Sequence, residues 1–120
     1  MDQVTEFNRL QFLIMVDGPL EAAELLDRIR TRLPDAVPYR RDSVDVRGNL
    51  LEINPNEGAD PRLAATDEDD YLHFRWRVEL TPTDRTVDED HQVALARELL
   101  QAIEGPQVRA TVCAAFEDRV

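Results

Sequence analysis

The residues most suited to chemistry form one acidic run, Asp67-Glu68-Asp69-Asp70, with a histidine, His73, three positions later. Carboxylates bind metal ions, so a metal site is the first chemistry to consider. A calcium loop also needs spaced oxygen ligands, a glycine and a distal glutamate, and the run does not meet that requirement. We therefore predict no metal site here and a solvated acidic segment instead.

The remaining candidates for catalysis lack partners at a useful spacing. His73 could titrate near neutral pH, but no nucleophile or orienting carboxylate can be assigned to it. His91 is expected to make local surface pairs at the start of a helix, for example with Asp88. Cys113 is the only cysteine, which excludes an internal disulfide and a multi-cysteine zinc site. We expect no enzyme activity and no cofactor.

The charge of the chain favours one class of partner over others. There are 25 acidic residues against 14 basic ones, all of them arginine, and the net charge is −11. Such a field repels phosphate backbones, which argues against nucleic acid, and it accelerates association with a basic protein. The alternative is that the acids only keep the surface solvated.

Length and hydropathy predict a single domain over residues 1–120. The apolar runs are all shorter than the ~20 residues that a membrane helix needs. The first residues, Met1 to Glu6, lack the basic start and apolar middle of a signal peptide. We expect a cytoplasmic protein that does not bind membranes.

Several segments have clear periodicity. Leu10 to Val16 is an apolar run typical of a central strand, and the spacing of Ala22, Leu26, Ile29 and Leu33 predicts a helix. Alternation predicts a strand from Tyr71 to Leu80, with Trp76 in the core, and another from Val108 to Phe116.

The connections between these segments are less regular. Two short strands, 44–46 and 51–53, flank a tight turn at 47–50. A long acidic loop is expected over 54–70. Thr86 and Glu89 have the spacing of a capping box, which predicts a second helix that ends at Gly105-Pro106.

The resulting order, β-α-β-β-β-α-β, predicts an α+β fold, a ferredoxin-like split βαβ sandwich with an extra strand. In this arrangement two helices cover one face of an antiparallel sheet. The first strand lies between the last strand and the one that begins near Tyr71. The uncovered face then presents an apolar centre rimmed with arginine, which is typical of an interface. Its predicted residues are Leu13, Met15, His73, Arg75, Arg77 and Arg109.

One short segment, Asp17-Gly18-Pro19-Leu20, lies between the first predicted strand and helix. It resembles the Asp-x-Pro-Gly-Leu segment of ACT-type regulatory domains, although glycine precedes proline here. The resemblance covers only these four residues and implies a paired ligand sensor of the same topology.

Two functions remain open. The first is a non-catalytic protein-binding module, such as an immunity-like or antitoxin-like inhibitor or an adaptor, that meets a basic partner. The second is a homodimeric, ACT-like module whose uncovered sheet faces pair and enclose a small ligand near Gly18 and His73. For the first function, the predicted contact residues are Asp67, Glu68, Asp69, Asp70, Asp88 and Asp90.

Overall fold

The computed structural model describes residues 9–41 and 43–120, which form an α+β fold with a six-stranded antiparallel sheet and three α-helices. The strands are β1 (Phe12–Asp17), β2 (Val37–Arg40), β3 (Ser43–Val46), β4 (Asn49–Pro55), β5 (Trp76–Pro82) and β6 (Arg109–Ala114). The helices are α2 (Ala22–Arg32), α3 (Pro61–Thr66) and α4 (Glu89–Ile103), with short 3₁₀ turns η1 (Asp70–His73) and η2 (Glu117–Arg119). None of the helices in these described ranges is long and apolar enough to cross a membrane.

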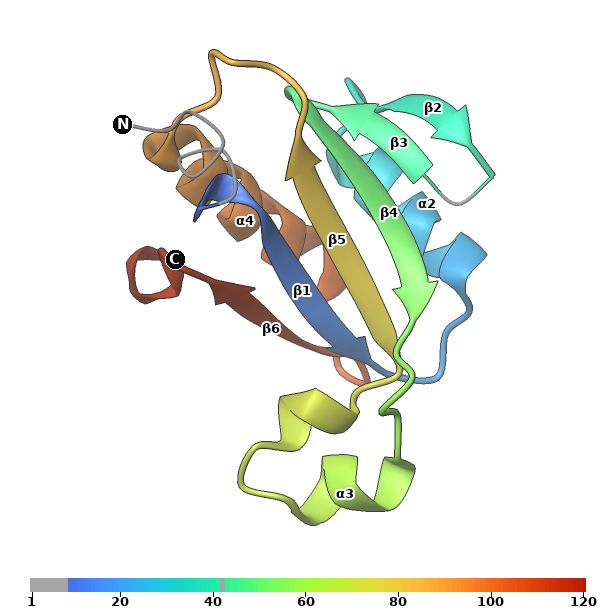
Figure 1. The fold of residues 1–120 in the computed structure, drawn as a ribbon. Coiled ribbons are helices and arrows are strands. Elements are labelled where there is room, and N and C mark those ends of the chain that lie inside the picture. The colour runs from blue at the N-terminus through green and yellow to red at the C-terminus, as the bar shows by residue number, and fades with distance from the viewer. Residues whose placement is uncertain (1–8, 42) are drawn as a thin grey trace.

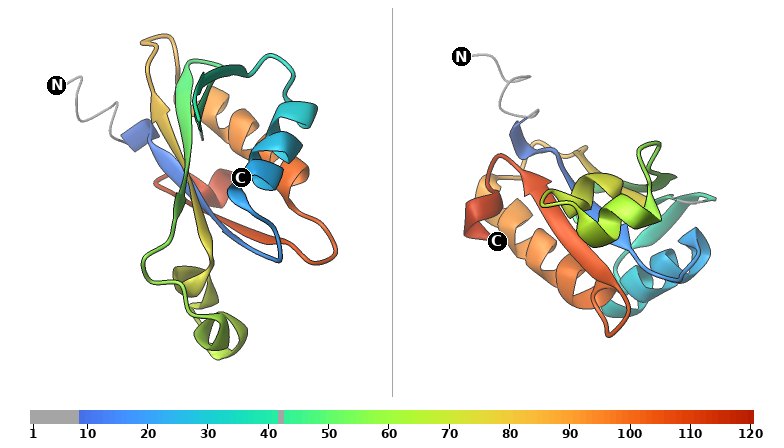
Figure 2. Two further views of the ribbon diagram at one scale, coloured as in Figure 1. Left: turned by 90° about the vertical axis from the view of Figure 1, so that its right-hand side faces the viewer. Right: turned by 90° about the horizontal axis from the view of Figure 1, so that it is seen from below.

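The strand order across the sheet is β2-β3-β4-β5-β1-β6, so β1 lies between β5 and β6 as predicted (Figure 1). The two long helices, α2 and α4, lie side by side on one face of the sheet (Figure 2). The short helix α3 projects from the end of the sheet where β4 leads into β5.

The main core lies between that sheet face and the two long helices. Alternate residues of β1 and β5 point into it, so the side chains of Ile14, Val16 and Val78 are completely buried. Trp76 is buried as predicted, and its indole Nε1 donates a hydrogen bond to the carbonyl oxygen of Leu20 at 3.0 Å. This bond satisfies the one polar atom of the ring and fixes the connection between β1 and α2.

The turn between β3 and β4 is tighter than the sequence predicted. Val46 pairs with Asn49, which leaves only Arg47 and Gly48 in the turn. Both have positive φ angles, 48° and 76°. Two consecutive positive φ angles are the geometry that matches a two-residue hairpin to the twist of its strands.

Three sequence predictions about elements were wrong. An additional edge strand, β2, precedes β3; it was missed because Pro38 interrupts its short alternating pattern. The expected strand from Tyr71 begins only at Trp76, since 70–73 forms η1. The expected loop over 54–70 contains α3, for which Asp60 and Pro61 supply the cap and the first helical residue.

The start of α4 also differs from the expected capping box. Asp88 is the N-cap, and its carboxylate accepts a hydrogen bond from the backbone N–H of His91 at 2.8 Å. Thr86 instead donates two hydrogen bonds to the Asp84 carboxylate, one from the Thr86 backbone N–H and one from the Thr86 hydroxyl. The Asp88 side chain therefore takes the role that spacing had assigned to Thr86.

Replacement of Gly48 with alanine should destabilise the fold by about 1–3 kcal/mol, because alanine is strained at this positive φ. The new methyl would also lie 2.7 Å from Val87 Cγ2. Urea unfolding measures the change. Gly58→Ala is the matched control, since its nearest new contact is 3.4 Å and its φ is not in the left-handed region. An equal decrease in the free energy of unfolding in both variants would contradict this account of the turn.

Candidate functional site

The segment from residue 56 to 75, here called the β4–β5 insertion, is closed at its base by Asn56. The side-chain amide of Asn56 donates to the carbonyl oxygens of Leu72 and Phe74 at 3.0 and 2.7 Å. Its backbone N–H donates to the carbonyl oxygen of Arg75 at 2.9 Å. These bonds hold the two ends of the insertion together where it leaves the sheet.

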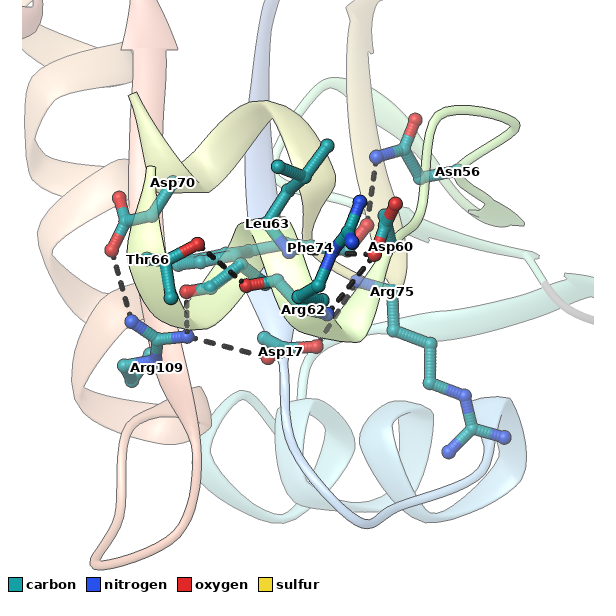
Figure 3. A network of polar contacts seen from close by, with 11 residues as sticks. Asp17, Asn56, Asp60, Arg62, Leu63, Thr66, Asp70, Phe74, Arg75 and Arg109 are labelled. Atoms are coloured by element: carbon teal, nitrogen blue, oxygen red, sulfur yellow. Dashed lines mark hydrogen bonds and ion pairs between the residues drawn. The ribbon is translucent and has the colours of Figure 1, made fainter. Parts of the chain in front are cut away.

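Arg109, at the start of β6, fastens the insertion to the sheet (Figure 3). Its guanidinium donates to the Asp70 carboxylate at 2.9 Å and to the Ala64 carbonyl oxygen at 2.8 Å. It also lies 3.4 Å from a carboxylate oxygen of Asp17, at the end of β1. The guanidinium carbon is 4.6 Å from the centre of the Phe74 ring, a cation–π distance. The side chain of Arg109 thus contacts α3 and η1 in the insertion and also the end of β1.

A second, smaller core lies beneath the insertion, on the sheet face opposite α2 and α4. It consists of Met15, Ala64 and Phe74, with Leu13, Tyr71 and Cys113 packed at its edge. Met15 and Leu13 do lie on the face opposite the long helices. Met15, however, is only 6% exposed, because the insertion covers it. The expected open face is therefore partly closed.

The uncovered remainder of this face forms a groove. Its volume is about 430 Å³, and it runs between β1, β6 and the insertion. A second hollow of about 340 Å³ continues it along β1 and β5 and shares Leu13, Arg77 and Cys113 with it. The groove is lined by Leu13, Met15, Asn56, Tyr71, Leu72, Arg77, Thr111, Val112, Cys113 and Glu117. Apolar side chains form much of this lining, and Leu72 in its wall is 51% exposed.

The charges around the groove give it a negative field. Among the described residues that line the two hollows, Arg77 is the one cation, and its guanidinium pairs with Glu79 at 3.3 Å. Desolvation raises the pKa of Tyr71, and the carboxylates of Asp69 and Glu117 raise it further. Burial likewise raises the pKa of Cys113, with a contribution from Glu117, which keeps the thiol protonated and unreactive.

Four of the six acids predicted to contact a partner are used inside the molecule. Asp67 lies 3.1 Å from the His73 ring and accepts from the Asp69 backbone N–H; these bonds lower its pKa, the backbone bond most. Asp70 binds Arg109, and the carboxylate of Asp88 caps α4. Arg119 pairs with Asp90 at 2.6 Å. In the described ranges, no hydrogen bond involves the carboxylates of the other two, Glu68 and Asp69.

The predicted sheet-face residues do not form one surface. Leu13, Met15 and Arg77 do lie together in the groove. His73 belongs to η1, and Arg75 precedes β5 and binds Leu20 and Glu21 at the end of the sheet. The alternation from Tyr71 to Leu80 concealed the break at Phe74. Tyr71 and Leu72 were missed as groove residues for the same reason.

No three His, Cys, Asp or Glu side chains within 9–41 and 43–120 are grouped so that they could hold a metal ion. The ring of His91 instead contacts the Arg47 carbonyl oxygen at 2.6 Å.

Comparisons of the chain with models of protein families, with curated proteins and with solved structures found no match.

Replacement of Arg109 with glutamine should loosen the insertion selectively. The amides of Ala64 and Asp67, which donate to Asp60 and Leu63 within α3, should exchange at least tenfold faster with solvent, while the amides of β1 and β5 keep their protection. Native-state hydrogen exchange measures this. Arg62→Gln, an exposed substitution on α3 itself, is the control. Uniform acceleration across the sheet would show that Arg109 supports the whole fold instead.

The negative field can be tested by the titration of Tyr71 in a Tyr39→Phe background, which leaves Tyr71 as the single tyrosine. The folded protein favours the neutral phenol of Tyr71, so its pKa should lie above the usual tyrosine value near 10. The protein should then lose stability as the pH rises from that usual value through the raised pKa. Glu117→Gln should lower this pKa, whereas Glu24→Gln on exposed α2 should not. Absorbance at alkaline pH measures both. No effect of Glu117→Gln would contradict the field described here.

Proposed function

We propose that this chain is a non-catalytic protein-binding module, immunity-like, antitoxin-like or adaptor-like in action, whose groove receives a basic partner. The observation that carries the proposal is the groove itself, which combines an apolar lining with a negative field. The exposed side chain of Leu72 stands beside Tyr71 in its wall, and a contiguous apolar patch rimmed by polar residues is typical of an interaction site.

Charge complementarity supports a basic occupant. Glu117 and Asp69 act at the groove, and Arg77 is already paired with Glu79. Glu68 and Asp69 also project from the insertion without internal hydrogen bonds in the described part of the chain. A cationic partner would gain from these charges chiefly during encounter. The acids at the start of α4 lie at the other end of the sheet (Figure 1), so they are not part of this proposed surface.

We also propose that the architecture is ferredoxin-like. The elements β1, α2, β4, β5, α4 and β6 follow the split βαβ order, with β4-β5-β1-β6 adjacent in the sheet. In this interpretation β2 and β3 extend the sheet at one edge, and the β4–β5 insertion replaces a short hairpin. The free thiol of Cys113 supports our proposal of a reducing, cytoplasmic location.

The second candidate function is a homodimeric small-ligand module. The groove volume of about 430 Å³ favours it, because this size suits a small organic ligand. Pairing of two uncovered faces would bring two chains of net charge −11 together, which disfavours it. Sedimentation at low and high salt separates the two functions: a stable dimer at both salt concentrations would support the second.

Leu72→Asp should weaken partner binding at least tenfold, which is about 1.4 kcal/mol. The partner is first captured with the tagged chain from native extract and purified, and the Kd is then measured by calorimetry. Because Leu72 is 51% exposed, the free energy of unfolding should change by less than about 0.5 kcal/mol.

Val37→Asp is the matched control, since Val37 is 60% exposed but lies on β2, at the far edge of the sheet. It adds the same charge and should change the Kd by less than about twofold. Equal weakening by both variants would mean that added negative charge, not the groove, controls binding. An unchanged Kd for Leu72→Asp would reject the groove as the site.

A further inference from the structure

The groove borders β6, one of the two edge strands of the sheet, and the direction of the β6 backbone groups can be derived. At one end, the backbone N–H of Ala114 donates to the Glu117 carboxylate at 3.4 Å. At the other end, Val108 exchanges two 3.2 Å backbone hydrogen bonds with Gly105. Both residues therefore point away from β1.

Backbone groups of alternate residues in a strand point to the same side. Ala110 and Val112, which lie between Val108 and Ala114, must then direct their N–H and C=O groups outward as well. Arg109, Thr111 and Cys113 face β1 and pair with Asp17, Met15 and Leu13. Within the described ranges, no hydrogen bond satisfies the outward groups of Ala110 or Val112.

Val112 supplies an independent sign that this edge opens into the groove. Its side chain belongs to the main core on the helix side, yet Val112 is also part of the groove lining on the opposite side. The backbone of Val112, at the edge, can reach both sides. The unpaired edge and the groove are thus parts of one surface.

The two edges of the sheet differ in how well they are protected. At the β2 edge, Pro38 lacks an N–H and the register shifts between Pro38 and Arg40. Both features hinder pairing with a further strand. Residues 109–114 contain no proline, and the pairing of β6 with β1 is regular along its whole length. An unprotected regular edge is a template for an added strand.

We propose that the partner binds as an extended segment that pairs with the free edge of β6 and lays alternate side chains into the groove. The inference rests on the proposed function and specifies how the partner is held. Ala110 and Val112 would provide the main-chain hydrogen bonds, and the groove would provide the side-chain contacts. The segment is basic, because Glu117 lines the groove and the guanidinium of Arg77 is paired with Glu79 at 3.3 Å. A second copy of this chain, also at −11, is the less suitable occupant.

The test uses a synthetic hexapeptide of alternating arginine and valine, capped at both ends, with the same peptide carrying glutamate for arginine as the charge control. Amide exchange is measured by NMR with and without peptide. In the free protein, the amides of Ala110 and Val112 should exchange much faster than those of Thr111 and Cys113. The arginine peptide should slow Ala110 and Val112 at least tenfold, and the glutamate peptide should not.

Ala110→Pro removes one outward N–H, and Ala110→Val retains it. The proline variant should bind the arginine peptide at least fivefold more weakly than the valine variant. Peptide binding that is lost in Leu72→Asp but leaves the Ala110 and Val112 amides unprotected would overturn strand pairing and leave the groove proposal intact. Binding that is insensitive to Leu72→Asp, or no binding up to millimolar peptide, would overturn both proposals. Slower exchange of the β2 amides, with no change at Ala110 and Val112, would show that the peptide pairs with the other edge of the sheet and would overturn the proposal.

Discussion

The β4–β5 insertion has too little apolar material to form a core of its own, and the rest of the candidate site depends on how it is held. It is rich in carboxylates and contributes Ala64 and Phe74 to the second core, with Tyr71 packed at its edge. Arg109 compensates for this deficit by joining Asp70, the Ala64 carbonyl and Asp17 around one guanidinium that also stacks on Phe74. With the insertion in place, Tyr71 and Leu72 form a wall beside the sheet. Without it, the face around Met15 would be open and there would be no groove.

The same arrangement separates two roles for the acidic residues. Asp60, Asp67 and Asp70 stabilise local structure by capping, by accepting a backbone hydrogen bond and by pairing with Arg109. Their charges are largely committed to these contacts. Within the described ranges, Glu68 and Asp69 are the acids of the insertion left to act on a partner, and Glu117 lines the groove while it accepts a hydrogen bond from the Ala114 backbone N–H. The net charge of the whole chain is thus a poor guide to which carboxylates bind.

The sequence predicted the parts of the fold that follow from periodicity. Two long helices, the central strand β1 and the parity that puts Val16 and Val78 in the core all follow from patterns of three, four or two residues. The position of β1 between β5 and β6 followed from the order of these elements. The sequence predicted a turn at 47–50, but the turn contains only Arg47 and Gly48, because Asn49 and Leu50 already pair with β3. Residue type alone does not determine which of these four residues join the strand.

The insertion could not be predicted in the same way. Leu72 and Phe74 continue the alternation of β5 in the sequence, but Leu72 is exposed and Phe74 packs on the opposite face from Trp76. Short helices such as α3 have no periodicity to detect, and only Asp60-Pro61 signals its start. The partners of Arg109 lie far away in sequence, at Asp17 and Asp70, so local spacing gives no indication of that contact. Of the predicted sheet-face residues, Leu13, Met15 and Arg77 lie together in the groove, and Met15 is buried there by the insertion.

The most direct measurement of the central claim is a set of nuclear Overhauser contacts from the ε-methyl group of Met15 in solution. If the insertion is packed on the sheet, this methyl should show contacts with the side chains of Phe74 or Ala64, together with dispersed amide shifts over 60–73. Absence of these contacts, with random-coil shifts over the same residues, would contradict the account, because the wall of the groove would not then exist.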